Sequence, residues 1–145
     1  MINDVRSVVE TTAGTTLIRV SREHHISEAR RVAKSLAESL GFRQISAYYV
    51  VISVSELANN LYFHAHQGGS ITLATVSRDG EHGIEIISED DGPGIADISL
   101  ALQDGFSTNG GLGGGLPGIT RLMDEFVISS EVGHGTRIVT RKWKQ

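Results

Sequence analysis

The 145-residue sequence contains no cysteine, only two prolines and no long run of apolar residues. The absence of cysteine excludes disulfides, iron–sulfur clusters and thiol catalysis. No segment approaches the roughly eighteen apolar residues of a membrane span, and the N-terminus lacks the pattern of a signal peptide. A formal net charge of −4 gives no general attraction to nucleic acid or anionic lipid. We therefore expect a soluble cytoplasmic protein that folds as one domain over residues 1–145, without a nucleic-acid or membrane partner.

Basic side chains are missing from the part of the chain that is richest in glycine. No lysine or arginine occurs between Gly92 and Thr120, and six glycines occur between Gly110 and Gly118. Such a run permits unusual backbone angles and exposes successive amides ahead of a helix, which predicts a phosphate-binding loop. The phosphate must then be neutralised by a metal ion, by backbone N–H groups and by a helix N-terminus. The spacing matches neither the Walker nor the Rossmann pattern.

The periodicity of apolar residues predicts alternating strands and helices. The predicted strands cover residues 14–21, 71–77, 83–90, 126–130 and 136–143. The predicted helices cover residues 26–40, 46–63 and 115–125, with Gly41 capping the first and Pro117 in the first turn of the third. Residues 78–81 form a hairpin turn, 98–102 a short helix and 104–115 a mobile loop. This order predicts an α/β fold, a two-layer sandwich with a mixed, mostly antiparallel sheet and helices on one face.

Glu56 and Asn60 are the polar exceptions in an unusually apolar predicted helix. Because they are four residues apart, their side chains project from the same face of the helix. A carboxylate beside an amide oxygen suits a hard cation such as Mg²⁺ and a hydroxyl nucleophile. The alternative is a solvated helix face, which the apolar surroundings disfavour.

Asp90 follows a strand that is predicted to be buried, and it stands two residues before Gly92 and four before Gly94. A carboxylate at a strand end can accept a hydrogen bond from the exocyclic amine of adenine, and the glycines allow the base to approach the backbone. The alternative is a turn with a helix-capping aspartate. Asp91 lacks the two-residue spacing to Gly92.

Several polar residues near these motifs have more than one interpretation. Ser107 and Thr108 lie in the glycine-rich loop, where they can bond a phosphate or be ordinary polar loop residues. His24, His25, His64 and His66 have no neighbouring cysteines and no HExxH spacing. We expect these histidines to be helix-end or surface residues and not zinc ligands.

Taken in order, the motifs resemble the N, G1, G2 and G3 boxes of the GHKL ATPase superfamily, which has the Bergerat nucleotide-binding fold. They are Glu56/Asn60, Asp90-x-Gly92-x-Gly94, Gly111-x-Gly113-x-Gly115 and Gly133-x-Gly135-Thr136. The resemblance implies ATP and Mg²⁺ as cofactors. It implies that Asn60 coordinates the metal, Asp90 recognises adenine and Thr136 supports the adenine pocket. The other nucleotide-binding residues that it implies are Gly92, Gly94, Ser107, Thr108, Gly111, Gly113, Gly115 and Leu116.

Within that superfamily the chain resembles the small bacterial serine kinases of the RsbW, SpoIIAB and RsbT group, most of all the stressosome switch kinases. The segments that carry this resemblance are SELANN, EDDGPGI, DGFSTNGGLGGGLPG and RLMDEF. It implies phosphorylation of STAS-domain scaffold and antagonist proteins (RsbS- and RsbR-like) with Glu56 as the catalytic base, followed by activation of a PP2C-type phosphatase (RsbU-like). Gly114 replaces the alanine common in the group, from which we expect a looser lid. Two alternatives stay open, an anti-sigma factor kinase and a nucleotide-gated binding module without phosphotransfer.

Overall fold

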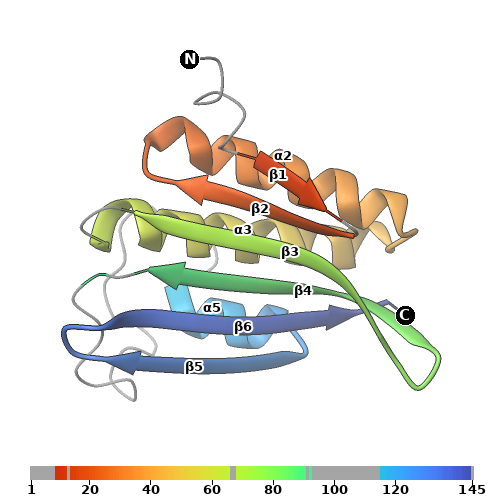
Figure 1. Cartoon of the computed structure of the whole chain (residues 1–145). Coiled ribbons are helices and arrows are strands. Elements are labelled where there is room, and N and C mark those ends of the chain that lie inside the picture. Colours follow the sequence, from red (N-terminus) through yellow and green to blue (C-terminus); the bar gives the residue numbers. More distant parts are fainter. Residues whose placement is uncertain (1–8, 13, 66–67, 91, 93–114, 145) are drawn as a thin grey trace.

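The protein is a two-layer sandwich in which a six-stranded sheet is covered on one face by helices (Figure 1). The computed structural model describes residues 9–12, 14–65, 68–90, 92 and 115–144. The strands are β1 Val9–Thr12, β2 Thr15–Val20, β3 Gly69–Arg78, β4 Glu81–Asp90, β5 Glu125–Glu131 and β6 Gly135–Trp143. The helices are α2 Glu23–Ser39, α3 Gln44–His64 and α5 Gly115–Leu122. None of these described helices is long and apolar enough to cross a membrane.

The sheet has the order β1-β2-β3-β4-β6-β5, and every pairing in it is antiparallel. The predicted two-layer sandwich is confirmed, but the prediction of a mixed sheet was wrong. The helices α2 and α3 return the chain to the end where β2 stopped, so Val20 pairs with Gly69 and β3 runs opposite to β2. The strands β4 and β5 run in the same direction, but they do not pair with each other because β6 lies between them.

Most predicted elements are confirmed, with differences at the ends. The turn between β3 and β4 contains Asp79 and Gly80, which both have positive φ, at 53° and 82°, as the hairpin prediction requires. The helix α5 ends at Leu122 because Glu125 already begins β5. The prediction missed β1, since four residues are too few to show an alternating pattern. The short helix at 98–102 and the loop at 104–114 lie outside the described residues.

The core lies between the helix-facing side of the sheet and the inner sides of the helices. In β4, buried Ile84 and Ile86 alternate with Glu85 and Ile87 on the opposite side of the sheet. The helix α2 contacts the core through small residues, which let its backbone approach the sheet closely. Fully buried core residues include Ile18, Val20, Ala29, Ala33, Ala37, Val50, Val54, Leu57, Ile71 and Leu73.

Both ends of α2 are fixed by local interactions. Gly41 follows the C-cap residue Leu40 and has a φ of 78°, which confirms the predicted glycine cap. At the other end the Nδ1 atom of His25 accepts hydrogen bonds from the backbone N–H groups of Ser21 (3.0 Å) and Arg22 (3.1 Å). Burial lowers the pKa of His25, which is only 5% exposed. His25 is therefore a helix-end residue, as predicted, but it is buried and not at the surface.

Candidate functional site

Four motif-bearing segments meet at one end of the sandwich. In Figure 1 this is the left end, where α3 finishes at His64, β4 finishes at Asp90, β6 begins at Gly135 and α5 begins at Gly115. The strands β4 and β6 are antiparallel neighbours in the sheet, so the end of β4 lies beside the beginning of β6. The G1 and G3 motifs are therefore neighbours.

Asp90 is held at the centre of this end of the sheet. It pairs with Gly69 on β3 and with Thr136 on β6. Its Oδ1 atom accepts a hydrogen bond of 2.7 Å from the backbone N–H of Gly92. This bond fixes the orientation of the carboxylate at the point where the chain leaves the strand. The sequence therefore placed Asp90 and Gly92 correctly at a strand end where the chain turns.

Two glycines allow neighbouring parts of the chain to pack closely against Asp90. A Cβ atom on Gly92 would lie 2.9 Å from Asp90 Oδ1 and 3.2 Å from the Cα atom of Ala65. A Cβ atom on Gly69 would lie 2.2 Å from the carbonyl oxygen of Glu89. A side chain at position 69 would require the backbone to move, and one at position 92 would push the Asp90 carboxylate out of place. The sequence interpretation missed Gly69, although a glycine pair directly before a strand is a recognisable signal of close backbone approach.

The hydroxyl of Thr136 is positioned by the hairpin between β5 and β6. Its Oγ1 atom lies 2.8 Å from the Oγ atom of Ser130, which also donates to the carbonyl oxygen of Gly135 at 3.1 Å. Gly133 and Gly135 have φ angles of 85° and 94°, so glycine is required in this turn. As register partners on adjacent strands, Thr136 and Asp90 lie on the same face of the sheet.

Glu56 and Asn60 lie one turn apart on α3, in the layer behind the sheet. Glu56 is 1% exposed and Asn60 is half-buried. A carboxylate and an amide oxygen on one helix face fit the preference of Mg²⁺ for a few protein oxygens, completed by water and phosphate. The chemistry of this pair therefore fits the predicted cation.

The helix α5 begins with residues of the predicted lid. Gly115 has a φ of 68°, and Leu116 and Pro117 are buried in the first turn. The first N–H groups of a helix carry partial positive charge, which suits a phosphate. Five of the predicted nucleotide-binding residues lie outside the described residues: Gly94, Ser107, Thr108, Gly111 and Gly113.

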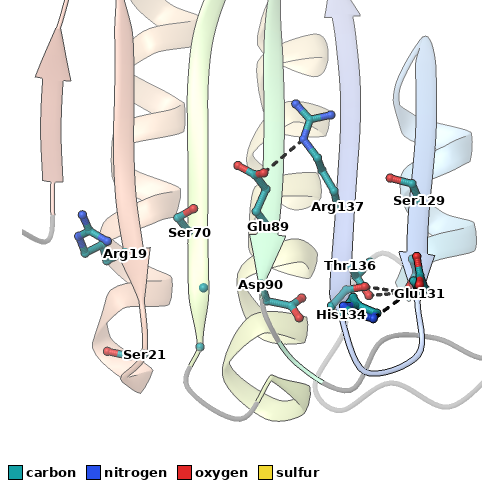
Figure 2. A pocket seen from close by; sticks show the side chains of 14 residues that line it. Arg19, Ser21, Ser70, Glu89, Asp90, Ser129, Glu131, His134, Thr136 and Arg137 are labelled. Carbon is teal, nitrogen blue, oxygen red and sulfur yellow. Dashed lines mark hydrogen bonds and ion pairs between the residues drawn. The ribbon is translucent and has the colours of Figure 1, made fainter.

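A cavity of about 980 Å³ opens beside Asp90 and Thr136 and continues over the outer face of the sheet. Figure 2 shows Arg19 on β2 and Arg137 on β6 at this cavity. Arg137 forms an ion pair of 3.3 Å with Glu89. Neither Glu56 nor Asn60 lines the cavity, so it belongs to the sheet side of this end.

These two arginines were missed by the sequence interpretation, which considered basic residues only within the glycine-rich stretch. The alternation in their strands could have identified them as outward-facing, because Arg19 lies between buried Ile18 and Val20 and Arg137 precedes buried Ile138. Their position at one cavity depends on the strand order, which sequence alone does not give.

Comparison with known proteins extends these observations. The sequence model of a family described as "Histidine kinase-like ATPase domain" matches residues 20–142. A Bacillus subtilis protein named "Serine/threonine-protein kinase RsbT" is 45% identical over 126 residues, which cover 87% of this chain and 94% of that protein. An "Anti-sigma F factor" of Clostridium acetobutylicum is 30% identical over 128 residues, covering 85% of this chain and 88% of that protein.

The fold is also found among solved structures. The structure of the RsbU and RsbW domains of a Mycobacterium tuberculosis protein superposes with a TM-score of 0.62 at 16% sequence identity. The match covers 94% of this chain and 34% of that longer chain. At this level of identity the likeness shows a shared fold.

Proposed function

The chain belongs to the histidine kinase-like ATPase domain family and is a serine/threonine-protein kinase, and from this premise we propose that it phosphorylates a STAS-domain partner. The single observation that carries the proposal is the 45% identity to RsbT over most of both chains. We propose that residues 1–145 act as one ATP-binding kinase domain in the cytoplasm. The partner is an RsbS- or RsbR-like scaffold or antagonist protein, and the kinase activates an RsbU-like PP2C-type phosphatase when it is released.

Adenine binds at Asp90 in this proposal. A carboxylate oriented by the Gly92 amide can accept a hydrogen bond from the exocyclic amine of the base. The absence of side chains at Gly69 and Gly92 lets the neighbouring backbone pack closely around Asp90, which helps to fix the position of its carboxylate. The Thr136 hydroxyl, fixed by Ser130, supports the same pocket.

The phosphates extend from there toward the start of α5 and toward Asn60. The N–H groups at the start of α5 and the glycine-rich lid, including Gly111, Gly113 and Gly115, donate to phosphate oxygens. Asn60 holds Mg²⁺ through its side-chain oxygen. When bound, Mg²⁺ neutralises the charge on the phosphate oxygens during transfer. Because phosphoryl transfer depends mainly on positioning and charge stabilisation, few protein groups are needed for the chemistry.

Glu56 acts as the general base toward the hydroxyl group of the phosphoacceptor. Its carboxylate accepts the proton of the serine or threonine hydroxyl and so orients that oxygen toward the γ-phosphoryl group. The nearly complete burial of Glu56 within α3 restricts its side chain to few conformations and excludes bulk water from it. Glu56 and Asn60 thus place the nucleophile and the metal one helical turn apart on a single rigid element.

The proposal is tested by incubating the protein with Mg²⁺, ATP and a purified RsbS-like STAS protein, followed by mass spectrometry. We expect one phosphoryl group on a serine or threonine of the partner. ATP binding without transfer to any STAS protein would support the nucleotide-gated binding module instead.

The similarity to anti-sigma F factor favours a second candidate, an anti-sigma factor kinase. A pull-down with a purified sigma factor and a PP2C-type phosphatase separates the two. We expect retention of the phosphatase, because the identity to RsbT is higher. Retention of the sigma factor alone would identify the second candidate.

A further inference from the structure

The helix α3 exposes large apolar side chains along one line on its surface. Ile45 is 49% exposed, Tyr48 is 57% exposed and Ile52 is half-buried. Their spacing of three and seven residues places them on one side of the helix, and Phe63, which is 45% exposed, returns to the same side five turns after Ile45. We call these four residues the α3 stripe.

The α3 stripe differs from a random scatter of exposed apolar residues. Single exposed apolar side chains are normal, but these four share a face of a helix whose one acidic residue, Glu56, is buried. A helix that is apolar on all sides is usually covered on all sides. The sheet covers the inner side of α3 (Figure 1), and α2 and α5 also pack against the helix, but Ile45 and Tyr48 stay exposed. The composition of α3 therefore indicates a contact with another molecule.

The α3 stripe leads directly to the proposed catalytic pair. Glu56 follows Ile52 by one turn, and it lies on nearly the same side of the helix as Ile45. With a rise of about 1.5 Å per residue, Glu56 is about 16 Å along the axis from Ile45. A segment bound along the stripe would therefore end beside the buried Glu56.

Basic residues surround the beginning of the stripe. Arg43 is the exposed N-cap residue of α3, and the Nζ atom of Lys144 lies close to Gly41, 3.2 Å from where a Cβ atom would stand. The Nζ atom of Lys142 lies 5.3 Å from the ring centroid of Tyr49 and 3.5 Å from Asp124. Asp124 balances the charge of Lys142, so the exposed Arg43 and Lys144 are the cations that attract negative charge to this end of the stripe.

We propose that the α3 stripe docks the phosphoacceptor protein through an amphipathic segment in which acidic residues flank apolar ones. The apolar residues of that segment pack on Ile45, Tyr48 and Ile52, and its acidic residues face Arg43 and Lys144. Docking in this direction brings the acceptor hydroxyl to Glu56. The inference rests on the proposed function, because it identifies the recognition surface for the substrate of that same site.

The test compares steady-state phosphotransfer to an RsbS-like STAS protein by the wild type and by Tyr48→Ala and Ile45→Ala. We expect the KM for the STAS protein to rise at least tenfold, with the kcat and the affinity for Mg²⁺-ATP unchanged. Arg43→Glu and Lys144→Glu should also raise this KM and weaken its dependence on salt. The matched control is Val127→Ala, which removes an equally exposed apolar side chain (62%) from the outer face of the sheet. It should leave every constant unchanged.

The outcomes separate this inference from the proposed function. If the wild type transfers phosphate and the stripe variants keep the wild-type KM, the docking surface is wrong and the kinase assignment stands. If the wild type transfers phosphate to no STAS protein, the proposed function fails. The docking inference then stands only if a photo-crosslinker at position 48 captures the RsbS-like STAS protein and one at position 127 does not. A dimer in sedimentation that Tyr48→Ala dissociates would assign the stripe to a second copy and overturn the inference.

Discussion

The two long helices of this protein differ in which side chains they place against the core and which they expose to solvent. The helix α2 places small apolar residues such as Ala29, Ala33 and Ala37 against the core and charged residues toward solvent. The helix α3 buries its glutamate and exposes Ile45 and Tyr48. Packing against the core explains the arrangement in α2. It does not explain why α3 buries a glutamate and exposes large apolar side chains. In the function that we propose, α2 supports the fold, whereas α3 also carries the chemistry and the recognition of the partner.

The largest effect is expected from Glu56→Gln on α3. Removing the proposed base while keeping the shape of the side chain should lower phosphotransfer by about 10²–10⁴-fold, with ATP binding retained. Quench-flow transfer assays and calorimetry measure the two quantities. The control is Glu38→Gln on the exposed side of α2, which should change neither. Equal transfer rates in Glu56→Gln and the wild type would show that Glu56 is not the catalytic base.

The next effect is expected from Asn60→Ala. Loss of the proposed metal ligand should abolish the contribution of Mg²⁺ to ATP affinity, a decrease of at least about tenfold. Calorimetric titrations of ATP with and without Mg²⁺ measure it. Asn59→Ala is the matched control, since Asn59 is the neighbouring half-buried asparagine. If both variants bind Mg²⁺-ATP as tightly as the wild type, Asn60 does not hold the metal.

For α2 the comparison predicts an effect on stability and not on catalysis. Ala33→Leu adds volume to a fully buried position and should lower the free energy of unfolding by about 1–3 kcal/mol. Ser35→Leu places the same side chain on the exposed side of α2 and should change stability by less than about 0.5 kcal/mol. Urea unfolding measures both. A loss of partner affinity in Ser35→Leu as large as in Tyr48→Ala would remove the distinction between the helices.

The smallest effect is a pH dependence at the start of α2. Burial, together with the nearby charges of His24 and Arg22, lowers the pKa of His25 below its ordinary value of 6.5, and the neutral ring accepts the Ser21 and Arg22 amides. Between the folded and unfolded pKa values the unfolded chain binds more protons, so the free energy of unfolding falls as the pH drops below 6.5. Urea unfolding at pH 7.5 and 5.5 should show this loss in the wild type, a slightly smaller loss in His24→Gln, which removes one cause of the shift, and the smallest loss in His25→Gln. Identical slopes in all three proteins would contradict it.

The sequence predicted the elements of the site better than their arrangement. The motif spacing correctly predicted that Asp90 stands at a strand end just before Gly92, whereas Thr136 was added by the resemblance to the family. The pairing of Asp90 with Thr136 could not be predicted, because it depends on β6 lying between β4 and β5. The same strand order makes the sheet antiparallel throughout.

Long-range packing explains the other omissions. Arg19 and Arg137 are 118 positions apart in the chain, and only the completed sheet brings them to one cavity. The burial of His25 depends on how α2 rests on the core, which no local pattern encodes. The exposure of Ile45 and Tyr48 was equally invisible, since an apolar helix predicts burial on every side.

The most direct test of the central claim is a mass-spectrometric comparison of one STAS protein after incubation with Mg²⁺-ATP and either the wild type or Glu56→Gln. The account predicts a single added phosphoryl group with the wild type and none with the variant, although both bind ATP equally. Equal phosphorylation by the two proteins would contradict the claim that α3 supplies the catalytic group.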